Sequence, residues 1–173
     1  LSKVYIPSNL TAIPDRCFSY CYALSEVELA EGCKTIGSYA FDDCYVLKSI
    51  TLPASLTEIK SDAFYNNKAL TEVKFADNAA LTTIMDSAFE GCQKLRTIEL
   101  PDTVETIGGN AFEDCYEMEL EALPASLTTI GTYAFSYCRK LKSAILPETV
   151  QEIGSGAFNN CTGILTAVIP DSV

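Results

Sequence analysis

The chain has 173 residues, of which 48% are hydrophobic and 20% charged, a composition that excludes an intrinsically disordered protein. Its 23 acidic and 12 basic residues give a net charge of -11, which disfavours binding to nucleic acid or anionic lipid and favours basic partners. Histidine is absent, which removes the commonest general base and the usual zinc ligand, and no apolar stretch approaches the roughly 20 residues of a membrane span.

Along the chain, one pattern returns seven times and organises the whole sequence. Its landmark is a phenylalanine that stands five residues after an isoleucine and, in six of the seven copies, directly after an alanine. Successive landmarks are 23 residues apart, except for one interval of 25. The landmarks, which number coils 1 to 7 from here on, are Phe18, Phe41, Phe64, Phe89, Phe112, Phe135 and Phe158.

Each copy predicts the same elements, and coil 3 illustrates them. Residues 47–52 alternate apolar and polar side chains and predict a strand, and residues 57–59 predict a shorter extended piece on the opposite wall. Residues 61–67 predict a single tight helical turn. A unit of this length cannot bury its own apolar face, but stacked units bury a continuous core. We therefore predict one α/β solenoid over residues 1–173, with a parallel β-sheet on one face and short strands and single helical turns on the other.

The repeat carries a specific resemblance, which is clearest in residues 123–143. They read Leu-Pro-Ala-Ser-Leu-Thr-Thr-Ile-Gly-Thr-Tyr-Ala-Phe-Ser-Tyr-Cys-Arg-Lys-Leu-Lys-Ser, which resembles the BspA-like leucine-rich repeats. The resemblance covers essentially all 173 residues. It implies an arc-shaped solenoid from a cell-surface or secreted protein of bacteria or parasitic protists that acts in adhesion and binds host proteins. The family has no catalytic motif to carry over, so we expect neither enzymatic activity nor a cofactor.

Both ends of the sequence suggest a longer array. The chain opens within a strand piece, and residues 169–173 begin a further copy. Solenoids need polar capping units, and neither end has one. We therefore expect these residues to be an uncapped fragment. Glycosylation sequons occur at Asn9 and Asn160, and they matter only if a eukaryotic secretory pathway made the chain.

The eight cysteines follow the repeat. Six of them stand three residues after the landmark phenylalanine, where coil 3 has Asn67. Cys17 replaces the alanine before the landmark, and Cys33 replaces an inward leucine or valine. Two interpretations stay open: a column of buried free thiols, or disulfides between neighbouring coils. A metal site is disfavoured because the chain has neither a CxxC pair nor histidine.

Acidic pairs lie in the turn after two of the landmarks. They are Asp42 with Asp43 and Glu113 with Asp114. Paired carboxylates can serve in acid–base or calcium chemistry, but no calcium-loop pattern accompanies them. A solvated turn is the prediction.

Tyrosines recur four residues after the landmark in coils 1, 2 and 5, as Tyr22, Tyr45 and Tyr116. An exposed tyrosine column would offer rigid contact area to a binding partner. Half-buried packing over the turn is the alternative interpretation.

The outward positions of the predicted strands give the better indication of a binding surface. They are charged or polar in the first five rows and apolar in the last three, where Leu120, Ala122, Ile145 and Val168 are candidate partner-binding residues. Glu121, however, falls at an inward position, where burial of a carboxylate is costly. Either these rows form a binding patch, or the strand near Glu121 is shifted so that Leu120 points inward and no patch exists.

Two functions follow. The first is a non-catalytic protein-binding module at the cell surface or in a secreted protein, which uses the exposed sheet face and adjoining loops to bind host or extracellular-matrix proteins. The second is an intracellular scaffold or spacer without a ligand of its own, which many reduced thiols would favour. Neither involves nucleic acid or membrane insertion, and the sequence gives no support for a glycan ligand.

Overall fold

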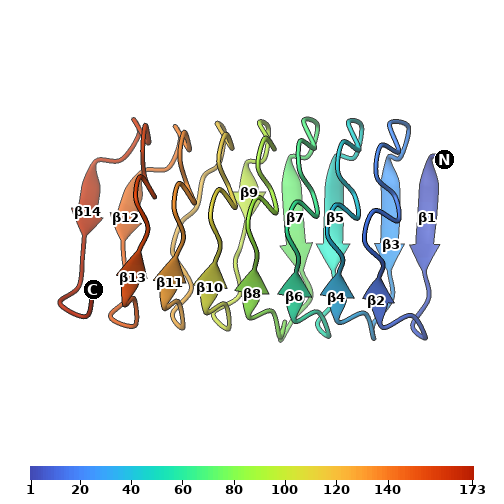
Figure 1. The fold of residues 1–173 in the computed structure, drawn as a ribbon, viewed down its shortest axis with the longest axis horizontal. Coiled ribbons are helices and arrows are strands. Elements are labelled where there is room, and N and C mark those ends of the chain that lie inside the picture. Colours follow the sequence, from blue (N-terminus) through green and yellow to red (C-terminus); the bar gives the residue numbers. More distant parts are fainter.

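The computed structural model describes residues 1–173 as a stack of coils with the two termini at opposite ends (Figure 1). Equivalent strands of successive coils pair in parallel at the repeat spacing, so that Ile50 lies beside Val73 and Ile36 beside Ile59. The strands form two layers that face each other across the core. The first layer contains β1 (Lys3–Ile6), β3 (Glu26–Leu29), β5 (Ser49–Leu52), β7 (Glu72–Phe75), β9 (Thr97–Ile98), β12 (Ser143–Ile145) and β14 (Thr166–Val168). The predicted solenoid is confirmed.

The second layer is one uninterrupted sheet of two-residue strands, in the order β13-β11-β10-β8-β6-β4-β2. Each strand ends on the isoleucine that precedes the landmark phenylalanine by five residues, which confirms the short extended piece predicted on this wall. Its members are β2 (Ala12–Ile13), β4 (Thr35–Ile36), β6 (Glu58–Ile59), β8 (Thr83–Ile84), β10 (Thr106–Ile107), β11 (Thr129–Ile130) and β13 (Glu152–Ile153).

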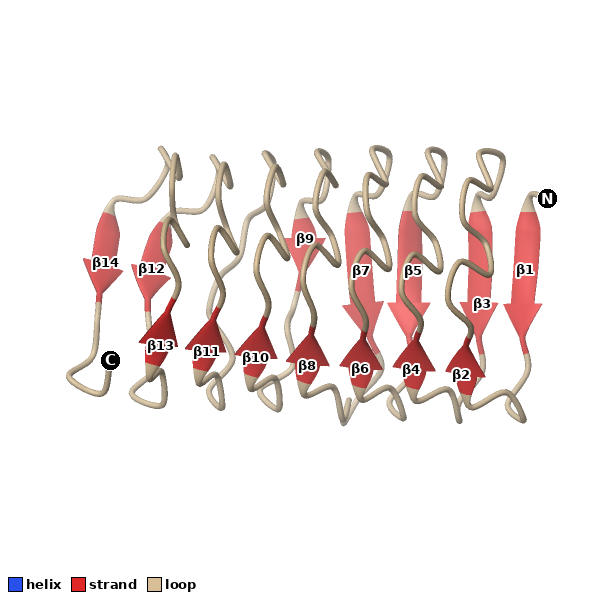
Figure 2. Ribbon diagram, in the orientation of Figure 1, coloured by secondary structure: helices blue, strands red, loops and turns tan.

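The first layer is divided into three short sheets, β1-β3, β5-β7-β9 and β12-β14. Figure 2 shows the larger division as a stretch of loop between β9 and β12, where coil 6 contributes no strand to the first layer. The two layers thus differ in continuity, although they are built from the same repeats.

The predicted single helical turn is wrong, because no helix forms anywhere in the structure. In coil 2, Tyr39 and Asp43 have φ values of 56° and 54°, which a right-handed helix does not allow. The amide of Phe41 donates to the carbonyl of Ala63 in the next coil at 2.8 Å, whereas the amide of Ala40 donates to Gly37 within its own coil at 3.2 Å. Tandem tight turns that also bond to the next coil therefore replace the helical turn.

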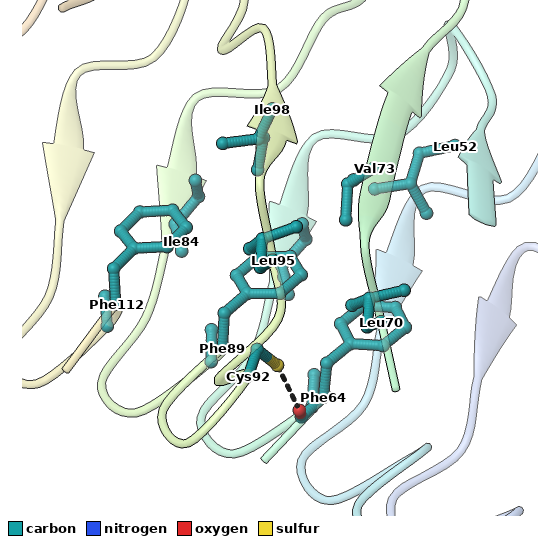
Figure 3. Close-up of a cluster of buried hydrophobic side chains, with 14 of the residues drawn as sticks. Leu52, Phe64, Leu70, Val73, Ile84, Phe89, Cys92, Leu95, Ile98 and Phe112 are labelled. Carbon is teal, nitrogen blue, oxygen red and sulfur yellow. Dashed lines mark hydrogen bonds between the residues drawn. The ribbon is translucent and has the colours of Figure 1, made fainter. Parts of the chain in front are cut away.

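The core is a column of phenylalanine rings that runs through the stack. Neighbouring rings are nearly parallel, with centroids 5.1 Å apart for Phe64 and Phe89 and 5.4 Å apart for Phe89 and Phe112. These distances suit offset stacking of aromatic rings. Figure 3 shows the ring of Phe64 beside Leu70 and the ring of Phe89 beside Leu95, each leucine six residues further along the chain. The column extends from Phe18 to Phe158, so every coil supplies part of the interior of its neighbours.

Candidate functional site

The gap in the first layer arises from a shift of the chain in coil 6. Leu120 points inward with only 7% of its surface exposed, whereas Glu121, at the position of Ile98 in coil 5, is exposed. A buried carboxylate would lose its hydration without a partner, so the backbone moves and Leu120 fills the interior instead. The shifted-strand interpretation is therefore correct at this coil, and Leu120 is corrected from an outward candidate to a core residue.

The shift leaves a short backbone segment of coil 6 without hydrogen bonds. The amide of Glu119 donates to the carbonyl of Arg96 at 2.9 Å, but residues 120–123 make no backbone hydrogen bond to any part of the chain. No backbone hydrogen bond joins residues 119–123 to β12 either. Four consecutive residues and the facing edge of β12 therefore present free amide and carbonyl groups.

A groove of about 620 Å³ opens at this gap. Its walls come from three coils: Thr97 to Leu100 at β9, Glu119 to Ala122 in coil 6, and Lys140, Lys142 and Ser143 before and in β12. A second hollow of about 310 Å³ shares Leu120 to Ala122 and Ser143 with the first and continues along Leu123, Ile145 and Pro147. The two hollows form one trough along coil 6, with a polar first part and an apolar second part.

The charges in the trough are only partly paired. Arg96 contacts Glu119, with Nε and Oε2 3.3 Å apart. Glu99, Glu121 and Lys142 have no oppositely charged group within ion-pair distance. The trough therefore offers uncompensated charge of both signs to a ligand.

The remaining apolar candidates lie beside this trough. Ile145 and Val168 are register partners on β12 and β14, and they are 57% and 48% exposed. Ala122 is also exposed, on the floor of the trough. In coil 7, by contrast, Ala144 is buried, so the regular register returns there. The structure thus supports a shorter apolar surface than the sequence predicted, without Leu120.

The tyrosines do not form one continuous column. Tyr22 and Tyr45 are exposed and stack with their ring centroids 5.3 Å apart. Lys68 occupies the next position, with Nζ 5.5 Å from the centroid of Tyr45. Tyr116 is half-buried and lies under the guanidinium of Arg139, 4.7 Å from its ring centroid. The exposed-column prediction therefore holds for the first pair, and the half-buried alternative describes Tyr116.

All eight cysteines are free thiols. In coil 4, Cys92 is fully buried and its Sγ donates to the carbonyl oxygen of Phe64 at 3.2 Å (Figure 3). Burial raises the pKa of Cys92 to about 12, and the same cause raises the pKa of Cys115 well above its ordinary value. A thiol that stays protonated is a poor nucleophile and a poor metal ligand, so the column is structural.

Cys17 is an exception to the prediction that all eight thiols lie inside, because its side chain is exposed. The equivalent Ala157 of coil 7 is 3% exposed, which shows that this position packs against the preceding coil. Coil 1 has no preceding coil within residues 1–173, so Cys17 is left uncovered.

The acidic pairs also differ from prediction. Asp42 is 2% exposed, its Oδ1 has no hydrogen-bond partner, and Asp43 is also buried, so the solvated-turn prediction is wrong for this pair. Burial, together with the neighbouring charge of Asp43, raises the pKa of Asp42. Glu113 and Asp114 are half-buried. Nowhere do three or more acidic or cysteine side chains converge so that they could hold a metal ion.

The sequence did not indicate Glu99 or Lys142 as parts of a site. They belong to ordinary repeat positions, and only the gap in coil 6 brings them to one trough. The available signal was the spacing of inward residues, which falls from three in Leu95 and Ile98 to two in Met118 and Leu120.

Comparison with protein families places this geometry among known repeats. The model for the BspA type leucine rich repeat region matches residues 1–84 and 70–173, in six copies. No protein of curated function matches the chain. The structure has no helix long and apolar enough to cross a membrane.

Solved structures of bacterial proteins share the fold. A leucine-rich repeat protein of T. pallidum, TpLRR, is 30% identical with a TM-score of 0.83, over 94% of this chain and 77% of its own. A leucine-rich repeat protein of Bacteroides ovatus is 26% identical with a TM-score of 0.63, over 99% of this chain and 46% of its own. A leucine rich cell surface protein of Faecalibacterium prausnitzii is 25% identical with a TM-score of 0.52, over 96% of this chain and 59% of its own. The chain thus spans only part of the length of these proteins.

Proposed function

Because the chain belongs to the BspA-type leucine-rich repeat family, we propose that it is a non-catalytic protein-binding module of a cell-surface or secreted protein. It binds its partner through the exposed face of the first strand layer, at β12 and β14, which follow the gap in coil 6. The F. prausnitzii relative is a cell surface protein, which supports this location. The net charge of -11 favours a protein partner with basic groups over nucleic acid or anionic lipid.

The observation that carries the proposal is the pair of exposed apolar side chains beside the trough. Ile145 and Val168 lie side by side on β12 and β14 and are about half exposed. Apolar side chains next to a recess with unpaired polar groups are typical of the centre of a protein interface, where buried contacts give most of the affinity.

The test changes Ile145 and Val168 to aspartate together. The chain is first used to isolate partners from extracellular-matrix extract, and each partner is purified and its Kd measured by biolayer interferometry. We expect the double variant to weaken binding by about tenfold or more, because charge replaces buried apolar contact. Val46→Asp is the matched control, since Val46 is 42% exposed outside the strand layers and should bind as the unmodified chain does. Unchanged affinity in the double variant would reject the proposed surface.

The second candidate is an intracellular scaffold that holds a geometry without a ligand. It is favoured by one observation, the eight free thiols, because free thiols persist best in a reducing compartment. Fractionation of the source cells with an antibody against the chain separates the two functions, since a scaffold would be recovered with the soluble contents of the cell.

A further inference from the structure

We propose that the interrupted coil 6 binds an extended peptide segment of the protein partner by strand addition. The segment lies in the trough along residues 119–123 and carries an acidic, a basic and an apolar side chain at alternate positions. This inference rests on the proposed function, because it names how the same surface recognises a protein.

The first argument is the row of unpaired backbone groups. Residues 120–123 have no backbone hydrogen bond, and no bond joins this segment to β12. On both sides the layer is regular: β9 pairs with β7, and β12 pairs with β14. An added strand satisfies such free amide and carbonyl groups and gains affinity from main-chain hydrogen bonds, as in other sheets with an open edge.

The second argument is the size of the trough. Its polar and apolar parts measure about 620 and 310 Å³ and share the residues of coil 6. Volumes of this order are typical of ligand sites in proteins. Its floor runs along five residues, which corresponds to about 16 Å of extended chain. A peptide of about five residues in β conformation therefore fits its length.

The third argument is the order of the charges along the trough. Glu119 forms an ion pair with Arg96. Lys142, at the same level of the trough, has no such partner. Two residues further along the chain Glu121 is unpaired, and the unpaired Glu99 lines the same trough from the wall at β9. Two residues further still, the trough becomes apolar at Leu123.

Steps of two residues are the side-chain period of an extended strand, so one face of a parallel peptide meets all three levels. An acidic side chain then lies near Lys142, a basic one near Glu121 and Glu99, and an apolar one near Leu123 and Ile145. Pairing of unlike charges fixes the direction and register of such a segment more than it adds affinity.

The probe for this proposal is the blocked peptide acetyl-Ser-Glu-Thr-Lys-Thr-Val-Ser-amide, followed by ¹H–¹⁵N NMR titration of the labelled chain. We expect saturable shifts of amides in residues 119–123 and in β12. Two control peptides test the mode of binding. One exchanges the glutamate and lysine, and the other carries N-methyl groups on alternate amides, which removes donors. Each should bind about tenfold or more weakly. Equal binding of the methylated peptide, or no binding of the probe, overturns strand addition.

A variant that restores the regular repeat gives the decisive measurement. Leu120→Thr with Glu121→Ile copies Thr97 and Ile98 of coil 5 into coil 6, so the strand should form and close the gap. We expect loss of peptide binding with a melting temperature that is unchanged or higher, which excludes unfolding as the cause. Glu72→Thr on β7 is the control, and it should leave binding intact.

The same variant separates this inference from the proposed function. If the closed variant still binds the probe peptide as before, strand addition is overturned. If it still binds the purified protein partner while the change of Ile145 and Val168 to aspartate abolishes that binding, the partner uses the apolar surface without the trough. In that case the inference fails and the proposed function stands.

Discussion

At the scale of single residues, the position three after the landmark phenylalanine satisfies backbone carbonyls deep in the core. In coil 3, Nδ2 of Asn67 donates to the carbonyls of Phe41 and Phe64, both at 2.8 Å. In coil 4, Sγ of Cys92 donates to the carbonyl of Phe64 at 3.2 Å. Both side chains are fully buried, so water cannot take their place. The position therefore selects a small hydrogen-bond donor, which explains why cysteine alternates with asparagine but not with valine.

This leads to a prediction for Asn67. Asn67→Ala leaves the buried carbonyl of Phe41 without a donor and the carbonyl of Phe64 with only the Cys92 thiol, and it should lower the free energy of unfolding by about 1–3 kcal/mol. Asn67→Cys restores the donor used in the other coils and should cost less than about half of that. Urea unfolding followed by circular dichroism measures both. Equal losses for alanine and cysteine would show that the hydrogen bond contributes nothing and that only volume counts.

At the scale of the element, the turn after each short strand is defined by two residues with positive φ. The first stands two residues before the landmark phenylalanine and the second two residues after it, as Ser87 and Gly91 do in coil 4 with φ of 55° and 73°. Every coil repeats both, so the strain of a left-handed residue recurs along the stack. Bonds from the turn to the next coil, such as that from the amide of Ser87 to the carbonyl of Gly109 at 2.8 Å, hold these residues in place.

The prediction at this scale compares two substitutions at Ser87. Ser87→Val places a β-branched side chain at positive φ, whereas Ser87→Gly removes the steric conflict. We expect the valine variant to be less stable than the glycine variant by about 1–2 kcal/mol, measured as the difference in urea-unfolding free energy. The same pair of substitutions at Thr83, which lies in β8, should reverse the order, because a strand favours valine.

The turn also shows how far the sequence predicts the structure. The spacing of the repeats, the positions of the strands and the phenylalanine column could be predicted, because apolar residues occupy the same positions in every copy. The left-handed positions could not, because different residue types occupy them, as Tyr39, Asp62, Ser87 and Asn110 show. A sequence signal for positive φ needs glycine or asparagine in each copy. Tight turns and a helical turn therefore looked alike.

The candidate site was predictable only in part, for a related reason. Glu121 is a carboxylate at an inward strand position, and this can be recognised within a single repeat. A shifted strand was therefore one of the two predicted outcomes. The trough is made by three coils, and its charged walls come from residues that are regular in their own repeats. Only the spatial arrangement shows that Glu99 and Lys142 face the same opening.

At the scale of the whole molecule, the repeat adds up small effects along the stack. Cys44, Cys92, Cys115 and Cys138 are fully buried, and burial raises the pKa of each thiol. The folded protein thus favours the neutral thiol more strongly than the unfolded chain does, in which the pKa of a cysteine is about 8.5. Each of these coils contributes one buried thiol. Because the coils unfold together, the losses of stability from ionisation of the separate thiols add up.

The sign of this linkage predicts alkaline sensitivity. Because the folded pKa lies above the unfolded one, the stabilisation is complete below about pH 8.5 and is lost as pH rises toward the folded value, which is about 12 for Cys92. Each buried thiol should contribute a fall of about 1.4 kcal/mol per pH unit in that window. Cys92→Asn, which copies coil 3, should reduce the slope of unfolding free energy between pH 9 and 10, measured in urea with reductant, by about that amount. Cys17→Ser removes an exposed thiol and should leave the slope unchanged. A slope insensitive to Cys92→Asn would mean that this thiol ionises as readily in the folded chain as in the unfolded one, against its complete burial.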